Sequence, residues 1–267
     1  MFSGFMINTW IAASIVAATA GLVGFFVVVR GASFAAHALP LSIFPGAAAA
    51  AWLGINEIAG LVAFAALGVI GIDALSRRGR PEVATALTLV MLLGLGTLFL
   101  SRTATYAQEV YGLLFGQVLG IGAADITPIA LVSAAAAGAV LLLFRPLLLS
   151  AVSRDLAQAR GAAPARTDLA FLIILAIASA VALPVVGALL VFSLMVGPAA
   201  AARNLTDRAD LAIALSVALS LLTVWAAIAL SYLTDWPVGF FVGFFGALAY
   251  GLGRGALHLR RARRAMA

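Results

Sequence analysis

The chain has 267 residues, of which 64% are hydrophobic and only 10% are charged. Soluble domains are roughly 45–50% apolar and about 25% charged, so this composition excludes a surface that faces water on all sides. The net charge of +6 comes from arginine, because the chain contains no lysine. The arginines cluster between apolar runs, as in loops on the cytoplasmic side of a membrane, and do not form the basic, polar face of a nucleic-acid binder. Cysteine is also absent, which excludes disulfides and thiolate metal sites.

Long apolar runs divide the chain into membrane spans, since a helix needs about 20 such residues to cross the hydrocarbon core. The predicted spans are residues 10–29, 34–53, 57–75, 82–100, 125–148, 169–186, 211–233 and 238–253. The more polar stretch 101–124 predicts a loop with one short interfacial helix. Residues 187–202 are apolar but short and contain Gly197-Pro198, which predicts a broken or re-entrant helix.

The positions of the arginines predict the orientation of these spans. With the N-terminus outside, Arg30, the arginines at 77–80, the polar loop 150–168 and the basic tail 254–267 all fall on the cytoplasmic side. This holds only if residues 187–202 also reach across the membrane. We therefore predict an all-α, polytopic membrane protein of about eight transmembrane helices plus one short broken helix, N-out and C-in, with residues 1–267 forming a single transmembrane domain.

Catalytic motifs are missing from the sequence. A P-loop needs a lysine to reach the nucleotide phosphates, so any ATP hydrolysis must come from a separate subunit. An intramembrane enzyme is also disfavoured, because Ser193 has no His or Lys beside it in sequence and does not lie in a Gly-x-Ser-x-Gly motif. The chain is therefore predicted not to be an enzyme.

His37 is the only histidine within a predicted span. Ionisable residues inside membranes are rare and usually functional, and imidazole suits zinc and other divalent transition metals. This favours a place for His37 on a metal pathway. The alternative is a structural histidine that bonds to a backbone carbonyl beside Pro40.

Five stretches stand in a characteristic order along the chain. They read VVVRGASFAAHALPLSIFPGAAAA, LLFGQVLGIGAADI, SRDLAQARG, PVVGALLVFSLMVGPAAAARNL and SYLTDWPVGFFVG. Together they resemble the permease subunit of the ABC importers that transport zinc, manganese or iron. The resemblance extends from about Trp10 to Gly253.

The resemblance implies a homodimeric permease in a bacterial cell membrane, surrounded by lipid and moved by alternating access. Its implied partners are a cytoplasmic ABC ATPase dimer and an extracellular metal-binding protein, with no nucleic acid. The transported divalent metal ion would be zinc, manganese or iron, and no cofactor would be bound tightly. The polar loop 150–168 would then hold the helix that couples to the ATPase, although an ordinary solvated loop is the alternative. The coupling residues implied are Asp155, Leu156, Ala157, Ala159 and Gly161.

The second span departs from the family pattern of an Asp followed one helical turn later by a His. Alignment on Pro45-Gly46 puts His37 at the Asp position and Leu41 at the His position. One ligand is thus changed and the other is lost, which leaves open a permease of the same architecture that carries a chelated metal or another small solute. A secondary transporter is a weaker alternative, because the SRDLAQARG loop favours an ATPase partner.

Prolines and glycines inside the spans predict breaks in the helices. Such breaks often line substrate sites in transporters, and the alternative is kinked packing. We expect breaks that line the pathway at four positions: Pro45, Gly46, Gly197 and Pro198. Gly60, Gly68 and Gly71 are instead expected to let helices approach closely.

Overall fold

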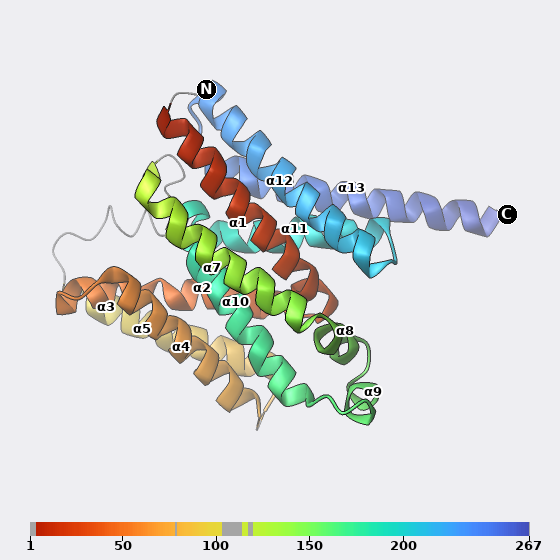
Figure 1. Cartoon of the computed structure of the whole chain (residues 1–267), viewed down its shortest axis with the longest axis horizontal. Coiled ribbons are helices and arrows are strands. Elements are labelled where there is room, and N and C mark those ends of the chain that lie inside the picture. The colour runs from red at the N-terminus through yellow and green to blue at the C-terminus, as the bar shows by residue number, and fades with distance from the viewer. Residues whose placement is uncertain (1–3, 78, 103–113, 117–119, 267) are drawn as a thin grey trace.

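The computed structural model of the chain describes residues 4–77, 79–102, 114–116 and 120–266. All regular structure in these ranges is helical (Figure 1). The helices are α1 (Gly4–Val29), α2 (Ser33–Ile43), α3 (Pro45–Leu53), α4 (Glu57–Ser76), α5 (Pro81–Leu100), α7 (Ala123–Leu142), α8 (Phe144–Val152), α9 (Arg154–Ala159), α10 (Pro164–Val186), α11 (Ala188–Leu205), α12 (Ala209–Thr234) and α13 (Val238–Met266).

Nine helical segments among the described residues are long and apolar enough to cross a membrane. They include the eight predicted spans, with α2 and α3 together forming the second, and α11 forms the ninth. The prediction of an all-α, polytopic membrane protein is therefore confirmed. The loop predicted at 101–124 lies largely outside the described residues.

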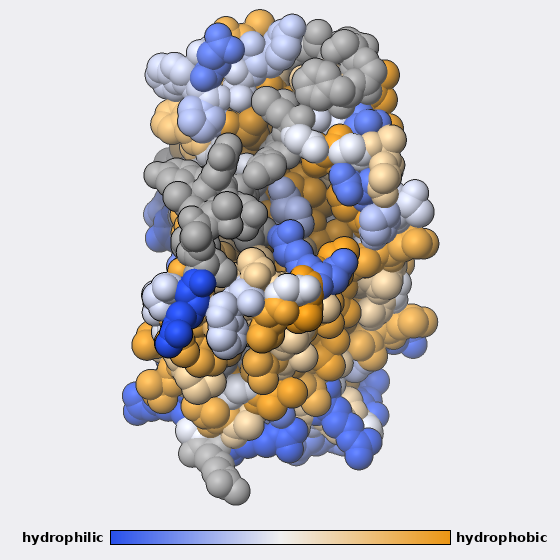
Figure 2. All heavy atoms as spheres, turned by 90° about the vertical axis from the view of Figure 1, so that its left-hand side faces the viewer, coloured by the Kyte–Doolittle hydropathy of each residue, from blue (hydrophilic) through white to orange (hydrophobic). Residues whose placement is uncertain are grey.

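The outer surface carries apolar side chains, as contact with lipid requires. Ile58, Ile70 and Val90, on α4 and α5, are among the most exposed large hydrophobic residues. Figure 2 shows apolar side chains over much of the face that lies on the left in Figure 1, with hydrophilic side chains gathered along its lower edge. Lipid tails can cover such a surface without exposing it to water.

The fifth predicted span, 125–148, is wrong at its inner end. The transmembrane helix α7 stops at Leu142, and a separate helix α8 begins at Phe144. Pro146 fits the break, because it lies in the first turn of α8, where the backbone hydrogen bond that proline cannot donate is least missed. Arg145 therefore belongs to α8 and not to a membrane span.

The predicted break at Pro45 is confirmed. Phe44 separates α2 from α3, and because Phe44 keeps right-handed helical angles the two helices form one kinked span. Both Pro45 and Gly46 are buried. Gly46 packs so closely on Gly60 of α4 that a Cβ on either glycine would meet the other's carbonyl oxygen, at 2.1–2.2 Å. The close approach predicted for Gly60 is thus confirmed, and this break packs helices together.

The predicted break at Gly197-Pro198 is wrong, because α11 runs without interruption from Ala188 to Leu205. Pro198 cannot donate a hydrogen bond to the carbonyl of Leu194, four residues earlier. The hydroxyl of Ser220 on α12 donates to that carbonyl instead, at 3.4 Å, so a neighbouring helix satisfies the freed group. The chain breaks at Gly187, which has φ +90° and separates α10 from α11.

Gly197 serves close packing between α11 and α13. A Cβ built on Gly197 would lie 2.6 Å from the carbonyl oxygen of Gly246, and a Cβ on Gly253 would lie 2.8 Å from the Cα of Ala201. Small residues let helix backbones approach in this way, which is how helices associate where no hydrophobic effect drives them together. The seam between α11 and α13 therefore depends on glycine.

The connections richest in arginine meet at one end of the bundle, which we call the Arg-rich end. Hydrogen bonds join Arg30, after α1, to Ser150 of α8 and to Asp168 near the start of α10. Figure 1 shows α8, α9 and the C-terminus on the side of the bundle opposite the N-terminus. Helix α13 continues through most of the basic tail, to Met266. Which side of the membrane this end faces remains a prediction.

We expect Gly197→Ala to destabilise the protein. The added methyl group would collide with the backbone of Gly246 and force α11 away from α13, and overpacking of this kind typically costs about 1–3 kcal/mol. Gly243→Ala on α13 is the matched control, because a Cβ there meets nothing within 4 Å. Thermal unfolding in detergent should show a lower melting temperature for Gly197→Ala alone. Equal melting temperatures would contradict the assigned packing role.

Candidate functional site

Helix α9 is a short, well-capped helix at the Arg-rich end. The hydroxyl of Ser153 accepts a hydrogen bond from the backbone N–H of Leu156, at 3.2 Å, and so caps the first turn. At the other end Gly161 has φ +78°, and the N–H of Ala162 donates to the carbonyl of Ala157, at 2.9 Å. The sequence SRDLAQARG therefore encodes a helix with a defined start and stop.

The two faces of α9 differ in exposure. Ala157 is fully buried against the helix bundle, whereas Leu156 remains 44% exposed. Asp155, Ala159 and Gly161 are exposed as well. Ala157 therefore anchors the helix to the bundle with its side chain facing inward, and the coupling role of the five residues stays a prediction.

Val152 is a second exposed apolar side chain, next to α9 in sequence, and the sequence analysis did not single it out. This last residue of α8 is 74% exposed. Extended Ser153 separates it from α9, so no helical spacing related it to Leu156. We call Val152, Asp155, Leu156 and Ala159 the α9 face.

A buried arginine fastens this region to α1. The Arg30 side chain is only 7% exposed and forms an ion pair with Asp168. One guanidinium nitrogen of Arg30 also donates to the carbonyl of Leu147, at 2.9 Å, and to the hydroxyl of Ser150, at 2.7 Å. The other oxygen of Asp168 accepts from Arg154, at 2.8 Å. We call these five residues the Arg30 network.

The electrostatics of Arg30 depend on that network. Burial lowers the pKa of the guanidinium, and the charge of Asp168 acts in the opposite direction. The guanidinium also lies over the ring of Phe171, 5.1 Å from its centroid, in a cation–π contact. A buried charge with this many partners is strongly held, since removing one partner of a buried pair typically costs about 3–5 kcal/mol.

His37 lies on α2 beside α11. Its ring meets Phe192 edge to face, with the centroids 5.1 Å apart. Its Nδ1 atom is buried and has no hydrogen-bond partner among the described residues. The alternative role, a hydrogen bond to a backbone carbonyl near Pro40, is therefore not seen, and the carbonyl of Pro40 instead accepts from the N–H of Phe44.

The surroundings of His37 offer no complete metal cage within one protomer. In the part of the chain that the structure describes, no three His, Cys, Asp or Glu side chains come together as a possible metal site. Phe34 and Leu41 share the His37 face of α2 by helical spacing, and Phe34 is 40% exposed. This partly open face of α2 therefore offers His37 as a single potential ligand.

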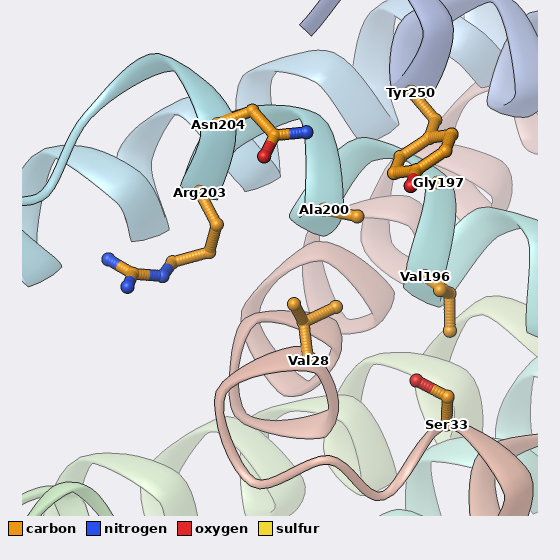
Figure 3. Close-up of a pocket in the computed structure, with 8 residues that line it drawn as sticks. All are labelled: Val28, Ser33, Val196, Gly197, Ala200, Arg203, Asn204 and Tyr250. Atoms are coloured by element: carbon orange, nitrogen blue, oxygen red, sulfur yellow. The ribbon is translucent and has the colours of Figure 1, made fainter. Parts of the chain in front are cut away.

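A pocket of about 420 Å³ lies one helical turn from His37 and Phe192 towards the Arg-rich end. Ser33 precedes His37 by four residues, and Val196 follows Phe192 by four. The lining residues are Val28, Ser33, Val196, Gly197, Ala200, Arg203, Asn204 and Tyr250. Figure 3 shows Arg203 at the opposite edge from Ser33 and Tyr250.

The polar groups of this pocket come from three helices. They are the hydroxyls of Ser33 and Tyr250, the amide of Asn204 and the guanidinium of Arg203, which has no ion-pair partner among the described residues. Gly197 lines this pocket from within a continuous helix, and its place on a transport pathway stays a prediction. Pro45 and Gly46 do not line it.

Ser193 has no catalytic surroundings. Its hydroxyl donates to the carbonyl of Val242 on α13, at 3.5 Å, and a Cβ on Gly246 would meet that hydroxyl at 2.4 Å. The serine thus fills the seam between α11 and α13.

The model of the ABC 3 transport family matches residues 3–250 of the chain. The chain belongs to this family. The match covers the helices, α9, His37 and the pocket described above. It confirms the resemblance found in the sequence.

Individual members of transport systems are also similar to this chain, at low sequence identity. The manganese import system permease protein ScaB of Streptococcus parasanguinis is 30% identical over 200 residues, which cover 74% of this chain and 71% of that protein. The chelated iron transport system membrane protein YfeC of Yersinia pestis is 27% identical over 255 residues, which cover 91% and 86%.

The fold also has a solved counterpart. PsaBC from Streptococcus pneumoniae, determined in complex with Fab, matches with a TM-score of 0.85 at 24% identity, over 97% of this chain and 96% of that one. This likeness shows that the helices of the two proteins are arranged in the same way.

Proposed function

We propose that the chain is the membrane-spanning permease subunit of an ATP-driven importer for a divalent transition-metal ion, in a bacterial plasma membrane. It acts as a homodimer with a cytoplasmic ABC ATPase dimer and an extracellular metal-binding protein. The observation that carries this proposal is the family match over residues 3–250. The functions for which its relatives are named, manganese import and chelated iron transport, supply the substrate class.

The α9 face is the proposed docking surface for the ATPase. It presents Val152 and Leu156, two exposed apolar side chains, at the Arg-rich end of the bundle. A P-loop needs lysine and the chain has none, so the energy must enter from a partner. A capped helix that is anchored by buried Ala157 can transmit force without unfolding.

His37 is the proposed metal contact on the pathway. Two protomers related by a two-fold axis would bring two imidazoles near that axis. A pair of neutral imidazoles is a weak site for a borderline metal such as zinc, whereas manganese prefers oxygen ligands. Iron remains within the range that imidazole accepts. Weak binding suits transport, since the ion must leave again, and it assigns selectivity chiefly to the extracellular binding protein.

A second candidate cargo is a chelated metal. Leu41 stands where the family pattern has a histidine ligand, and Arg203 brings an unpaired positive charge to the nearby pocket. A guanidinium with neighbouring hydroxyl and amide donors favours the carboxylates of a chelate over a bare cation. The two cargoes can be separated by an uptake experiment. Uptake of the labelled metal is measured with excess chelate as competitor, in the wild-type protein and in Arg203→Gln.

The predicted orientation can be tested by single cysteines, because the chain has none of its own. Gln158→Cys on α9 should resist an impermeant thiol reagent in intact cells. Ile55→Cys, an exposed position between α3 and α4, should react. Both sites should react once the cells are permeabilised. The opposite labelling pattern would reverse the orientation.

Charge on the α9 face should weaken docking of the ATPase. We expect Leu156→Asp to lower permease-dependent stimulation of ATP hydrolysis about tenfold, which corresponds to roughly 1.4 kcal/mol of docking free energy. The reason is that the substitution puts an unpaired charge into an apolar contact. Gln158→Asp adds the same charge at an exposed position that is already polar and serves as the control. Wild-type stimulation in Leu156→Asp at normal membrane levels would remove α9 as the docking element.

The identity of residue 37 should decide ion preference. We expect His37→Ala to reduce zinc uptake about tenfold or more, because a ligand is lost. His37→Asp should move the preference towards manganese, and His37→Asp combined with Leu41→His should do so further by restoring the family pair. Radiolabelled zinc and manganese uptake into proteoliposomes measures both effects. If His37→Asn and His37→Ala both transport at the wild-type rate, His37 is not a ligand.

A further inference from the structure

Arg30 lies at the junction between α1 and α2, the helix that carries His37. It is the first residue of the turn that joins the two helices. The turn is tight: Gly31 has φ +65°, its N–H donates to the carbonyl of Val28, and the N–H of Ala32 donates to the carbonyl of Val27. This pattern is a Schellman motif. These hydrogen bonds fix the backbone of the connection between α1 and α2.

His37 follows this turn by less than two helical turns. Helix α2 begins at Ser33, which lines the pocket at the edge opposite Arg203 (Figure 3). Because the turn is short and hydrogen-bonded, a movement of the Arg30 backbone is passed on to the start of α2. The position of His37 therefore depends on what holds Arg30.

The side chain of Arg30 is held by hydrogen bonds to the helices on either side of α9. Its partners are Leu147 and Ser150 on α8, and Asp168 near the start of α10. Asp168 in turn binds Arg154, the first residue of α9. One carboxylate thus bridges an arginine of the α9 helix and the arginine of the α1–α2 turn.

We propose that Arg30 is a positioning residue that couples the α9 face to His37, by transmitting movement of α8 and α9 through Asp168 to the α1–α2 turn. This inference rests on the proposed function, since it takes the α9 face as the surface that the ATPase moves.

The Arg30–Asp168 and Arg154–Asp168 ion pairs differ in the exposure of their arginine side chains, and this difference gives them different roles. Arg30 is 7% exposed and Asp168 32%, so this pair is expensive to separate and moves as a unit. Arg154 is 67% exposed, and an exposed ion pair contributes little to folding stability. The Arg154–Asp168 ion pair can therefore be removed by mutation while the fold remains intact.

The test uses the complete transporter, with permease, ATPase and binding protein reconstituted in proteoliposomes. ATP hydrolysed and radiolabelled zinc imported are measured together, and the melting temperature of each permease is recorded. The variants are Arg30→Lys, which keeps the charge but not the forked contacts, and Arg154→Gln. Arg208→Gln is the matched control, because it breaks an exposed ion pair with Asp210 that also has a 2.8 Å contact but does not involve α9 or the α1–α2 turn.

We expect Arg30→Lys and Arg154→Gln to raise the ATP hydrolysed per ion imported about 2- to 30-fold. Arg208→Gln should keep the wild-type ratio. If Arg30→Lys fails to insert into the membrane, Arg154→Gln decides alone. A lowered melting temperature with an unchanged ratio would mean that Arg30 is only a structural anchor, and it would overturn the inference.

Leu156→Asp in the same assay separates this inference from the function on which it rests. If Leu156→Asp lowers ATP hydrolysis but Arg154→Gln and Arg30→Lys keep the wild-type ratio, docking at α9 stands and the coupling role of Arg30 falls. If Leu156→Asp changes nothing, the docking proposal itself fails, and with it the route through Arg30.

Discussion

Close approach of backbones at glycine holds the centre of this membrane domain together. Within lipid no hydrophobic effect pulls helices towards one another, so packing at small residues must do so. Helix α11 shows this most clearly. A Cβ on Gly24 of α1 would lie 2.0 Å from the carbonyl oxygen of Met195, and one on Gly197 would lie 2.6 Å from that of Gly246 on α13. Helix α11 is thus held between α1 and α13, and the position of Phe192 beside His37 depends on that packing.

The second constraint is the cost of burying charge. Most arginines avoid this cost by lying at the Arg-rich end, where side chains such as Arg154 and Arg208 remain more than half exposed. Arg30 is buried instead, and its burial is tolerated because Asp168, Ser150 and a backbone carbonyl surround it. A charge that must be matched so completely fixes the relative positions of α1, α8 and α10. The same contact that stabilises the end of α1 therefore sets the geometry between α9 and the pathway.

Features that depend on local sequence could be predicted, and those that depend on distant partners could not. Length and hydropathy were sufficient for the spans, and Pro45 was sufficient for the kink between α2 and α3. The Gly197-Pro198 break failed because Ser220, more than 20 residues away, satisfies the carbonyl that Pro198 leaves free. Arg30 looked like one more loop arginine because Asp168 is 138 residues away in sequence. The inward direction of Ala157 likewise became visible only once α9 was packed on the bundle.

The unpaired Nδ1 of His37 bears on how firmly the pathway can hold its cargo. Histidines that bind resident metals usually donate their second ring nitrogen to a carbonyl or carboxylate, which fixes the ring and raises its basicity. Nδ1 of His37 is buried without such a partner among the described residues, and the ring is held instead by its edge-to-face contact with Phe192. Such a ring is oriented by packing but not strengthened as a ligand. If the proposed function is right, His37 binds the passing ion only transiently. Its contribution to transport then depends on the movement of α2 during the transport cycle and not on its affinity for the ion.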